Sequence, residues 1–393
     1  MDNVVIVSAC RTAIANFNGA LSQFTATELG AMAIEEAVKR AGIEKSMVDE
    51  VIMGNVLPCS LGQNPGRQAM IKAGLPMEGG AITVNKVCGS GLKAIMLGEQ
   101  AIKCNDADII VAGGMESMTN APFYLDKARN GYRMGAGKIE DHMVHDGLWD
   151  VVNDYHMGYT AELMKDKFNI STEEMNEFSV QSNDKAIEAS EKGLFNEEIF
   201  PVEVPQRKGE PVIFSKDEGP RKTSLEIISK LKPAFKKGGT VNAGNASKIS
   251  DGAAAVVIMK ESRAKELGLK PLVKIVAQGA AGRVLEEVLV TPISSIPKVC
   301  KKAGLKIEDI DLHEINEAFA VTSVAIVKEL GIDFNKVNVN GGAVALGHPI
   351  GASGTRVLVT LIHAMKQRSV RYGMASLCLG GGEAVSMIVE NCD

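Results

Sequence analysis

The sequence contains an internal repeat, and this feature limits the possible folds more than any other. The run Cys88-Gly-Ser-Gly91 leads into an apolar helical pattern, and a related run, Gly351-Ala-Ser-Gly354, leads into a second one. The apolar run Ile110–Glu116, which ends in Gly-Gly-Met-Glu, is similar to Leu377–Glu383, which ends in Gly-Gly-Gly-Glu. We therefore expect two similar halves of one fold in a single chain.

The repeat is interrupted in the first half. Ala254–Met259 is similar to Ala384–Val389, but these two runs lie about half as far apart as the other repeated runs. A polar insertion accounts for the difference, and insertions of this size often carry a lid, a binding surface or an assembly surface. The expected parts are an N-terminal core half (residues 1–118 plus 250–268), an inserted loop domain (119–249) and a C-terminal core half (269–393).

Short apolar runs alternate with helical patterns along both halves, which predicts an α/β fold. The runs expected to form buried strands are Val4–Val7, Glu50–Met53, Ile109–Ala112, Ala255–Met259, Leu272–Val276 and Ser386–Val389. The expected helices are Thr27–Arg40, Gly91–Lys103, Ser171–Glu191, Ser295–Ala303, Glu317–Glu329 and Gly354–Lys366.

Charge and composition exclude several classes of function. A net charge of −5 and an aromatic content of 4% argue against binding of nucleic acid. The chain shows neither an apolar run of roughly 18 residues nor a signal peptide, so we expect a cytoplasmic protein without membrane contact. The seven widely spaced cysteines form no CxxC pair, so neither a disulfide framework nor a metal site is expected. The run His313-Glu-Ile-Asn-Glu317 lacks the second histidine of a zinc-protease motif, although its Asn316 carboxamide could hold a water.

Cys88 is the first candidate for chemistry. It follows a strand-like run, Ala81–Asn85, and precedes a helix that begins near Leu92. The dipole and free N–H groups of a helix N-terminus lower a thiol pKa and can hold a developing oxyanion. The alternative interpretation is that Cys88 is only a small buried residue at a tight turn. A dinucleotide-binding turn, Gly89-x-Gly91-x-x-Ala94, is disfavoured because the turn recurs at Ser353-Gly354 as a feature of the repeated fold.

His348 and Cys378 also stand where chemistry is common. His348 lies in a glycine-rich loop that corresponds to the Cys88 neighbourhood in the repeat, so the fold would bring both loops to one face. Histidine is the usual base that activates a thiol. Cys378 ends a strand, at the place that the repeat makes equivalent to Val111, and three glycines with free N–H groups follow it. Taken alone, either residue could be structural.

Together these motifs resemble those of the thiolase family. The matching runs, in order along the whole chain, are Asn85-Lys-Val-Cys-Gly-Ser-Gly91, Asn316-Glu-Ala-Phe319, Gly347-His-Pro-Ile-Gly-Ala-Ser-Gly354 and Cys378-Leu-Gly-Gly-Gly382. The resemblance implies a duplicated thiolase-like core in a layered αβαβα arrangement with an inserted loop domain. It also implies an acyltransferase whose substrates are coenzyme A (CoA) thioesters and which holds no tightly bound cofactor.

The resemblance assigns a role to each reactive residue. Cys88 is expected to be the nucleophile that forms an acyl-thioester intermediate, with His348 as its activating base. Cys378 is expected to be the acid and base at the substrate α-carbon. Asn316, through a water, and His348 would bind the thioester oxygen of the acetyl group that forms the enolate. The backbone N–H groups of Cys88 and Gly380 would form the oxyanion site on the acyl-enzyme.

The same resemblance implies a short-chain substrate and an oligomer. His156-Met157 corresponds to the element that recognises acetoacetyl substrates, and the loop around Asn120–Gly135 to the one that joins biosynthetic members into homotetramers. The residues expected to contact CoA are Leu148, Arg221, Ala243, Ser247, Ala318 and Phe319, of which Leu148 and Ala318 are equally compatible with plain packing.

Three departures from the family pattern leave every catalytic group in place. Where the family often has Met-Gly-x-Gly-Pro, this chain has Val288-Leu-Val-Thr-Pro292, in a segment expected to line the acyl pocket. Lys248 and Ala384 each stand where glycine is common, the first of them beside the CoA site.

The expected activity is that of an acetyl-CoA C-acetyltransferase, which condenses two acetyl-CoA molecules reversibly into acetoacetyl-CoA and CoA. The main alternative is a 3-ketoacyl-CoA thiolase for longer chains. A ketoacyl synthase would carry a second histidine in place of Asn316, and a non-catalytic acyl-CoA-binding protein would lack Cys88, His348 or Cys378.

Overall fold

Two β-sheet halves form the core of the computed structural model, which describes residues 2–392. The first half contributes β1 (Val4–Thr12), β3 (Glu50–Gly54), β4 (Gly80–Val84), β5 (Ile109–Ser117) and β13 (Ser250–Lys260). The second half contributes β14 (Val273–Gly282), β15 (Leu312–Ile315), β16 (Tyr372–Leu379) and β17 (Glu383–Asn391). The strand order is β15-β16-β17-β14-β1-β13-β5-β3-β4, and two residue pairs between β1 and β14 join the halves.

The two halves share one strand order, as the repeat predicts. β13 is antiparallel to β1 and β5, and β3 is parallel to β5. In the same way, β17 is antiparallel to β14 and β16, and β15 is parallel to β16. The first strand of each half even carries a register irregularity at a similar place, between Ile6 and Ser8 in β1 and between Ile275 and Ala277 in β14.

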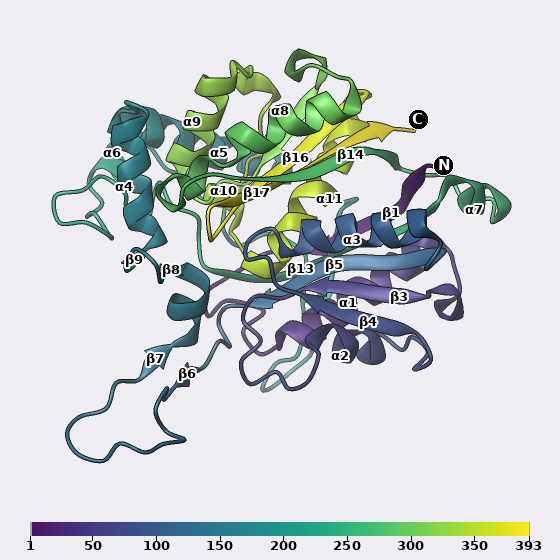
Figure 1. Cartoon of the computed structure of the whole chain (residues 1–393), viewed down its shortest axis with the longest axis horizontal. Coiled ribbons are helices and arrows are strands. Elements are labelled where there is room, and N and C mark those ends of the chain that lie inside the picture. Colours follow the sequence, from purple (N-terminus) through teal and green to yellow (C-terminus); the bar gives the residue numbers. More distant parts are fainter. Residues whose placement is uncertain (1, 393) are drawn as a thin grey trace.

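Helices form three layers around and between the sheet halves (Figure 1). α1 (Ala26–Ala41) and α2 (Pro65–Lys72) cover the outer face of the first half, and α8 (Pro292–Ala303) and α9 (Ala320–Leu330) cover that of the second. α3 (Ser90–Cys104) and α11 (Ile350–Arg368) lie between the halves, where Leu92 and Leu361 pack in one apolar cluster with strands of both. The predicted αβαβα arrangement is confirmed. Burial on both faces explains why the strands are continuous apolar runs.

The predicted equivalence of Cys378 and Val111 is wrong. Val111 is the third residue of β5, whereas Cys378 is the seventh residue of β16, so Met115 occupies the corresponding place. The glycines explain the error. Gly114 lies inside β5, where a Cβ would come within 2.2 Å of a backbone carbonyl oxygen of α11, whereas residues 380–382 follow the end of β16 and lead into β17.

The predicted helix Glu317–Glu329 begins later, at Ala320. The Glu317 carboxylate accepts hydrogen bonds from Ser182 Oγ at 2.7 Å, Asn338 Nδ2 at 2.8 Å and the Val344 N–H at 3.0 Å. These partners from three other segments hold Glu317 in the extended stretch before α9.

The segment between β5 and β13 leaves and re-enters the sheet at neighbouring strands, where Ser117 pairs with Asp251. Its elements are β6 (Phe123–Tyr124), β7 (Glu140–Asp141), a π-helix (Met143–Leu148), β8 (Trp149–Asp150), β9 (Tyr155–His156), α4 (Met157–Lys167), α5 (Thr172–Glu191), β10 (Ile199–Phe200), β11 (Val202–Val204), β12 (Val212–Phe214) and α6 (Leu225–Ser229). Figure 1 shows β6, β7 and the loop between them as an arm that extends away from the body, at the lower left. Short elements elsewhere are β2 (Ala15–Asn16), α7 (Glu261–Glu266), α10 (Ala343–Leu346) and the 3-10 helices Lys45–Met47, Leu285–Val290, Ile307–Asp309 and Phe334–Lys336.

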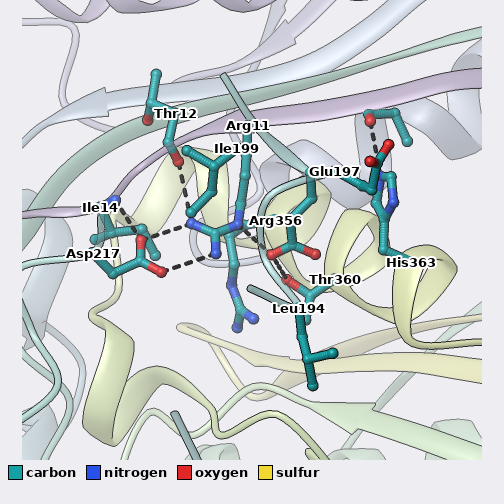
Figure 2. Close-up of polar contacts among 12 residues, drawn as sticks. Arg11, Thr12, Ile14, Leu194, Glu197, Ile199, Asp217, Arg356, Thr360 and His363 are labelled. Carbon is teal, nitrogen blue, oxygen red and sulfur yellow. Dashed lines mark hydrogen bonds and ion pairs between the residues drawn. The ribbon is translucent and has the colours of Figure 1, made fainter. Parts of the chain in front are cut away.

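Buried ion pairs attach this segment to the core (Figure 2). The buried Arg11 guanidinium on β1 donates to both carboxylate oxygens of Asp217, at 2.7 and 2.9 Å, and to Glu198 at 2.7 Å. Asp217 also accepts from the Ile14 N–H at 2.7 Å, and Glu198 accepts from Thr360 Oγ1 on α11 at 3.1 Å. Charged groups that are buried away from solvent therefore join β1, the segment between β5 and β13, and α11.

Candidate active site

One cavity of about 440 Å³ collects the residues predicted to react. Cys88, His348, Cys378 and Gly380 all line it, although they come from distant parts of the sequence. Most of the remaining wall is apolar and includes Val87, Met118, Leu148, Met157, Phe235, Val288, Leu289, Ala318, Phe319 and Ile350. An apolar cavity with a few convergent polar groups is the usual form of a small-molecule site.

A strained turn presents Cys88 beside the N-terminus of α3. Val87 has a φ of +46°, which is unusual for a β-branched residue, and its N–H donates to Asn85 Oδ1 at 3.0 Å. Ser90 Oγ accepts from the Lys86 N–H at 2.8 Å and lies 2.6 Å from the Val87 carbonyl oxygen, to which it donates. Backbone strain that is held by several hydrogen bonds is typical of functional sites.

Burial dominates the ionisation of the Cys88 thiol. It raises the pKa of Cys88 to about 11, although the N–H groups of Gly380 and of Cys88 itself favour the thiolate. The expectation of a lowered thiol pKa is therefore wrong, because the apolar surroundings outweigh the helix N-terminus. Reaction at neutral pH then requires a base that takes the proton as the sulfur attacks.

His348 is held as a neutral imidazole in a defined tautomer. Ser353 Oγ donates to the Pro349 carbonyl at 2.9 Å, so it accepts from His348 Nδ1–H at 2.5 Å. With the proton on Nδ1, Nε2 is the accepting nitrogen and faces Asn316 Nδ2 at 3.4 Å. Burial and the positive charge of Arg356 lower the pKa of His348 to about 3. An uncharged ring with an accepting Nε2 is the form that a general base needs.

Asn316 lies beside His348, immediately after β15. The residue is fully buried, and its N–H donates to the Ser376 carbonyl at 2.9 Å. Its side-chain Oδ1 has no hydrogen-bond partner among the described residues. A buried acceptor without a partner is costly, so the position suits a water or a substrate group.

Cys378 lies close to Cys88, near the end of β16. Burial and the neighbouring Cys88 sulfur both raise the pKa of the Cys378 thiol. Gly381 and Gly382 have φ values of +87° and +78°, which let the chain turn into β17 soon after Cys378. The Gly380 N–H, at the start of this turn, favours the thiolate form of Cys88.

The residues predicted to contact CoA line two adjoining hollows. The cavity that contains Cys88 is also lined by Leu148, His156, Met157, Ala243, Ser247, Ala318 and Phe319. Arg221 instead lines a neighbouring hollow of about 200 Å³, which shares Ala243 and Lys248 with the first. The two hollows together offer an extended path for a ligand longer than an acyl group.

Phe235 is a wall residue that the sequence analysis missed. Its ring stacks on His156 with centroids 4.7 Å apart and meets Phe319 edge to face at 6.0 Å. His156 Nδ1 accepts from the Gly158 N–H at 2.9 Å, which fixes the orientation of the imidazole. The one signal in the sequence is a lone aromatic residue in the basic, turn-rich run 232–239.

The segment Val288–Pro292, whose sequence departs from the family pattern, lies partly in the cavity wall. Val288 and Leu289 line the cavity. Thr291 is fully buried, and its hydroxyl lies 2.6 Å from the Glu383 carbonyl oxygen, on the strand side of the segment. Substitutions at 288 and 289 therefore face a ligand directly, whereas Thr291 acts on packing.

The described residues contain no clustered metal ligands. Within 2–392, no group of three or more His, Cys, Asp or Glu side chains is arranged to hold a metal ion. None of the helices in that range combines the length and the apolarity that a bilayer crossing requires.

Two family models together match almost the whole chain. Residues 4–262 match the thiolase N-terminal domain, and residues 269–391 match the thiolase C-terminal domain. The chain belongs to the thiolase family. In this thiolase, Cys88 comes from the N-terminal domain, and Asn316, His348 and Cys378 come from the C-terminal domain.

Similar proteins match this thiolase over their full length. It is 53% identical over 388 residues to the acetyl-CoA acetyltransferase of Pseudomonas aeruginosa, which covers 98% of this chain and 99% of the relative. It is 53% identical over 391 residues to the acetyl-CoA acetyltransferase of Cupriavidus necator, with 99% and 100% covered. The crystal structure of the Bacillus anthracis acetyl-CoA acetyltransferase has a TM-score of 0.97 at 42% identity and covers 100% of this thiolase and 99% of that chain.

Proposed function

We propose that this thiolase is an acetyl-CoA C-acetyltransferase, which condenses two acetyl-CoA molecules reversibly through an acetyl-thioester on Cys88. The observation that carries this function is one cavity that holds two thiols, Cys88 and Cys378, and the neutral imidazole of His348. One thiol can carry an acyl group while the other moves a proton, which is what carbon–carbon bond formation between two thioesters needs. The names of full-length relatives at about half identity agree with this activity.

In the first half-reaction, Cys88 takes the acetyl group. His348 Nε2 accepts the thiol proton as the sulfur attacks the thioester carbonyl of acetyl-CoA. The N–H groups of Cys88 and Gly380 hold the resulting oxyanion, since both N–H groups already favour negative charge on the Cys88 sulfur. The bond between the acetyl carbon and the CoA sulfur then breaks. Cys378 gives its proton to that sulfur, so CoA leaves as a thiol and Cys378 becomes a thiolate.

In the second half-reaction, the Cys378 thiolate removes a proton from the methyl carbon of a second acetyl-CoA. Protonated His348 and Asn316, acting through a water, hold the enolate oxygen, and the unpartnered Asn316 Oδ1 supports that assignment. The enolate carbon attacks the acetyl carbonyl, and the carbon–sulfur bond to Cys88 breaks. The Cys88 sulfur recovers its proton from His348, and the reverse sequence is thiolysis.

The domain division and the CoA contacts belong to the same proposal. The core halves are residues 1–118 plus 250–268 and residues 269–393, and the inserted loop domain is 119–249. CoA lies along the inserted domain and is closed in by Ala318 and Phe319 from the C-terminal half, because residues of both parts line the two hollows. CoA thioesters are substrates, and the reaction needs no tightly bound cofactor.

The arm supports a homotetramer joined partly through the loop Asn120–Gly135. Phe123, Met134 and Ile139 are 65%, 99% and 64% exposed in the single chain. Apolar side chains that project from an arm gain stability when a second copy covers them. Light scattering should show a tetramer for the unchanged protein and a smaller assembly for Met134→Lys, and a monomeric unchanged protein would contradict this assembly.

Thiolysis of acetoacetyl-CoA by free CoA tests the function. The purified protein should release two acetyl-CoA per acetoacetyl-CoA, and Cys88→Ala should lower the rate about 10⁴-fold or more without changing the circular dichroism spectrum. Cys104→Ala is the matched control, because Cys104 is exposed and does not line the cavity. Near-normal turnover by the Cys88 variant would overturn the assignment.

A further inference from the structure

Lys248 binds both ends of the turn that carries His348. Its ammonium donates to the carbonyl of Gly219 and, at 2.7 Å, to the carbonyl of Ala345 in α10. Its own carbonyl accepts the His348 N–H at 3.0 Å and the Ser250 hydroxyl at 3.0 Å. One residue therefore holds residues 345–348 through its side chain and through its backbone.

The backbones around this lysine approach one another closely. A Cβ at Gly219 would lie 2.3 Å from the Ala345 carbonyl oxygen, and a Cβ at Gly347 would lie 2.2 Å from Ser250 Oγ. Gly347 also has a φ of +113°, which side chains rarely adopt. The turn before His348 is thus packed tightly on both sides of Lys248.

The ammonium is half-buried, and its hydrogen-bond acceptors are backbone carbonyls rather than a carboxylate. Burial and the nearby Arg221 guanidinium lower the pKa of Lys248 to about 8, and the Glu317 carboxylate acts in the opposite direction. The two carbonyl oxygens therefore set where the ammonium lies, and the ammonium in turn holds the two carbonyl-bearing turns together.

Lys248 also lies where the two hollows meet. It lines the catalytic cavity with Cys88 and His348, and it lines the neighbouring hollow with Arg221. A CoA thioester that extends from one hollow into the other passes this side chain. Contacts made near Arg221 and the orientation of His348 are therefore linked through one residue.

We propose that Lys248 is a positioning residue for acyl transfer: it fixes the His348 turn against Gly219 and thereby sets how His348 Nε2 faces the Cys88 thiol. This role rests on the proposed function of Cys88 and His348. Displacement of a catalytic group by about 1 Å costs about 100-fold in rate. Loss of the ammonium should therefore lower kcat, whereas the affinity for substrate depends on the many other wall residues.

Lys248→Met tests this role, because methionine keeps an unbranched stem and removes the N–H donors. We expect kcat for thiolysis to fall about 10- to 100-fold, with KM for acetoacetyl-CoA changed by less than about threefold. Lys248→Arg keeps donors and should recover most of kcat. Lys298→Met is the matched control, since Lys298 also donates to a backbone carbonyl, that of Ala280 at 2.7 Å, but is exposed and outside the catalytic cavity.

Alkylation of Cys88 by iodoacetamide can be followed by mass spectrometry of the Cys88 peptide. Substitution of a residue with only a structural role would not change the rate of this reaction. Lys248→Met should slow alkylation near neutral pH and alter its pH profile, because His348 assists loss of the thiol proton. If that variant fails to fold, Lys248→Gly replaces it with the same expectations. A folded variant with unchanged kcat and an unchanged alkylation profile would overturn the positioning role and leave acyl transfer standing. Absence of thiolysis in the unchanged protein would instead refute the function itself.

Discussion

Ser353 Oγ lies 2.5 Å from His348 Nδ1 and donates its own proton to the Pro349 carbonyl at 2.9 Å. The serine therefore accepts from the imidazole, and the proton on Nδ1 makes Nε2 the basic nitrogen. Both side chains belong to one short loop and the helix turn that follows it. A local contact thus decides which nitrogen of His348 is free to act as a base.

Removal of this hydroxyl should impair catalysis without affecting the fold. We expect Ser353→Ala to lower kcat for thiolysis about 10- to 100-fold, because the ring is free to rotate or to carry its proton on Nε2. Steady-state kinetics with acetoacetyl-CoA and CoA measure the effect. Ser323→Ala is the control, since Ser323 is a buried hydroxyl on α9 without a hydrogen-bond partner among the described residues. Equal rates for the two variants would count against the tautomer assignment.

Cys378→Ala should separate the two half-reactions. We expect acylation of Cys88 to depend less on Cys378 than the step that removes a proton from carbon. Labelled acetyl-CoA should therefore still acetylate the variant, while formation of acetoacetyl-CoA falls about 10²- to 10⁴-fold, the usual contribution of a general base. Rapid quench and intact-mass measurements follow the two steps separately. Equal losses in both would contradict the division of roles.

The free protein should hold Cys88 and His348 as a neutral pair. Burial raises the pKa of Cys88 to about 11 and lowers the pKa of His348 to about 3, so neither group is charged at neutral pH. The ultraviolet absorbance of a thiolate should therefore be absent from Cys88 between about pH 6 and 9, when the spectrum is compared with that of Cys88→Ala. A thiolate–imidazolium pair would instead show this absorbance throughout that range.

We expect the acyl-length preference to depend on Val288. The unchanged protein should prefer acetoacetyl-CoA and tolerate five- or six-carbon ketoacyl-CoA, because Val288 and Leu289 form the wall there. Val288→Met adds volume and should raise the ratio of kcat/KM for four-carbon over eight-carbon substrate about tenfold. Thr291→Ser, on the strand side of the same segment, should leave this ratio unchanged. A ratio that favours the eight-carbon substrate in the unchanged protein would instead support the 3-ketoacyl-CoA alternative.

The ion pairs of Arg11 should matter for stability. Asp217→Asn keeps the shape of the side chain but leaves the buried guanidinium with Glu198 as its remaining charged partner. We expect a loss of about 3–5 kcal/mol in the free energy of unfolding, measured as a lower urea midpoint. Asp166→Asn, which breaks a surface pair with Lys165, should cost less than about 1 kcal/mol. Equal midpoints for the two variants would show that the buried pair contributes little.

Local sequence motifs predicted much of the fold and of the candidate site. The repeat predicted two halves with one strand order, and the glycine-rich runs marked the loops of Cys88, His348 and Gly380. β15 was missed because the polar residues His313 and Glu314 interrupt its apolar pattern. Glu314 is buried there and bonds to Arg356 at 3.1 Å, and that partner lies 42 positions away. Lys248 drew notice as a departure, but its contacts with Gly219 and Ala345 could not be predicted.

The sequence by itself determined the duplication and the family and predicted the candidate reactive groups, because these depend on residues that are neighbours in the chain. Only the tertiary structure decided the charge states of those groups. The helix N-terminus beside Cys88 predicted a low thiol pKa, yet burial among walls from distant segments reverses the direction. Likewise, Arg11 meets Asp217 across 206 positions of sequence. Desolvation and long-range pairing depend on which segments meet in space, and no local pattern records that.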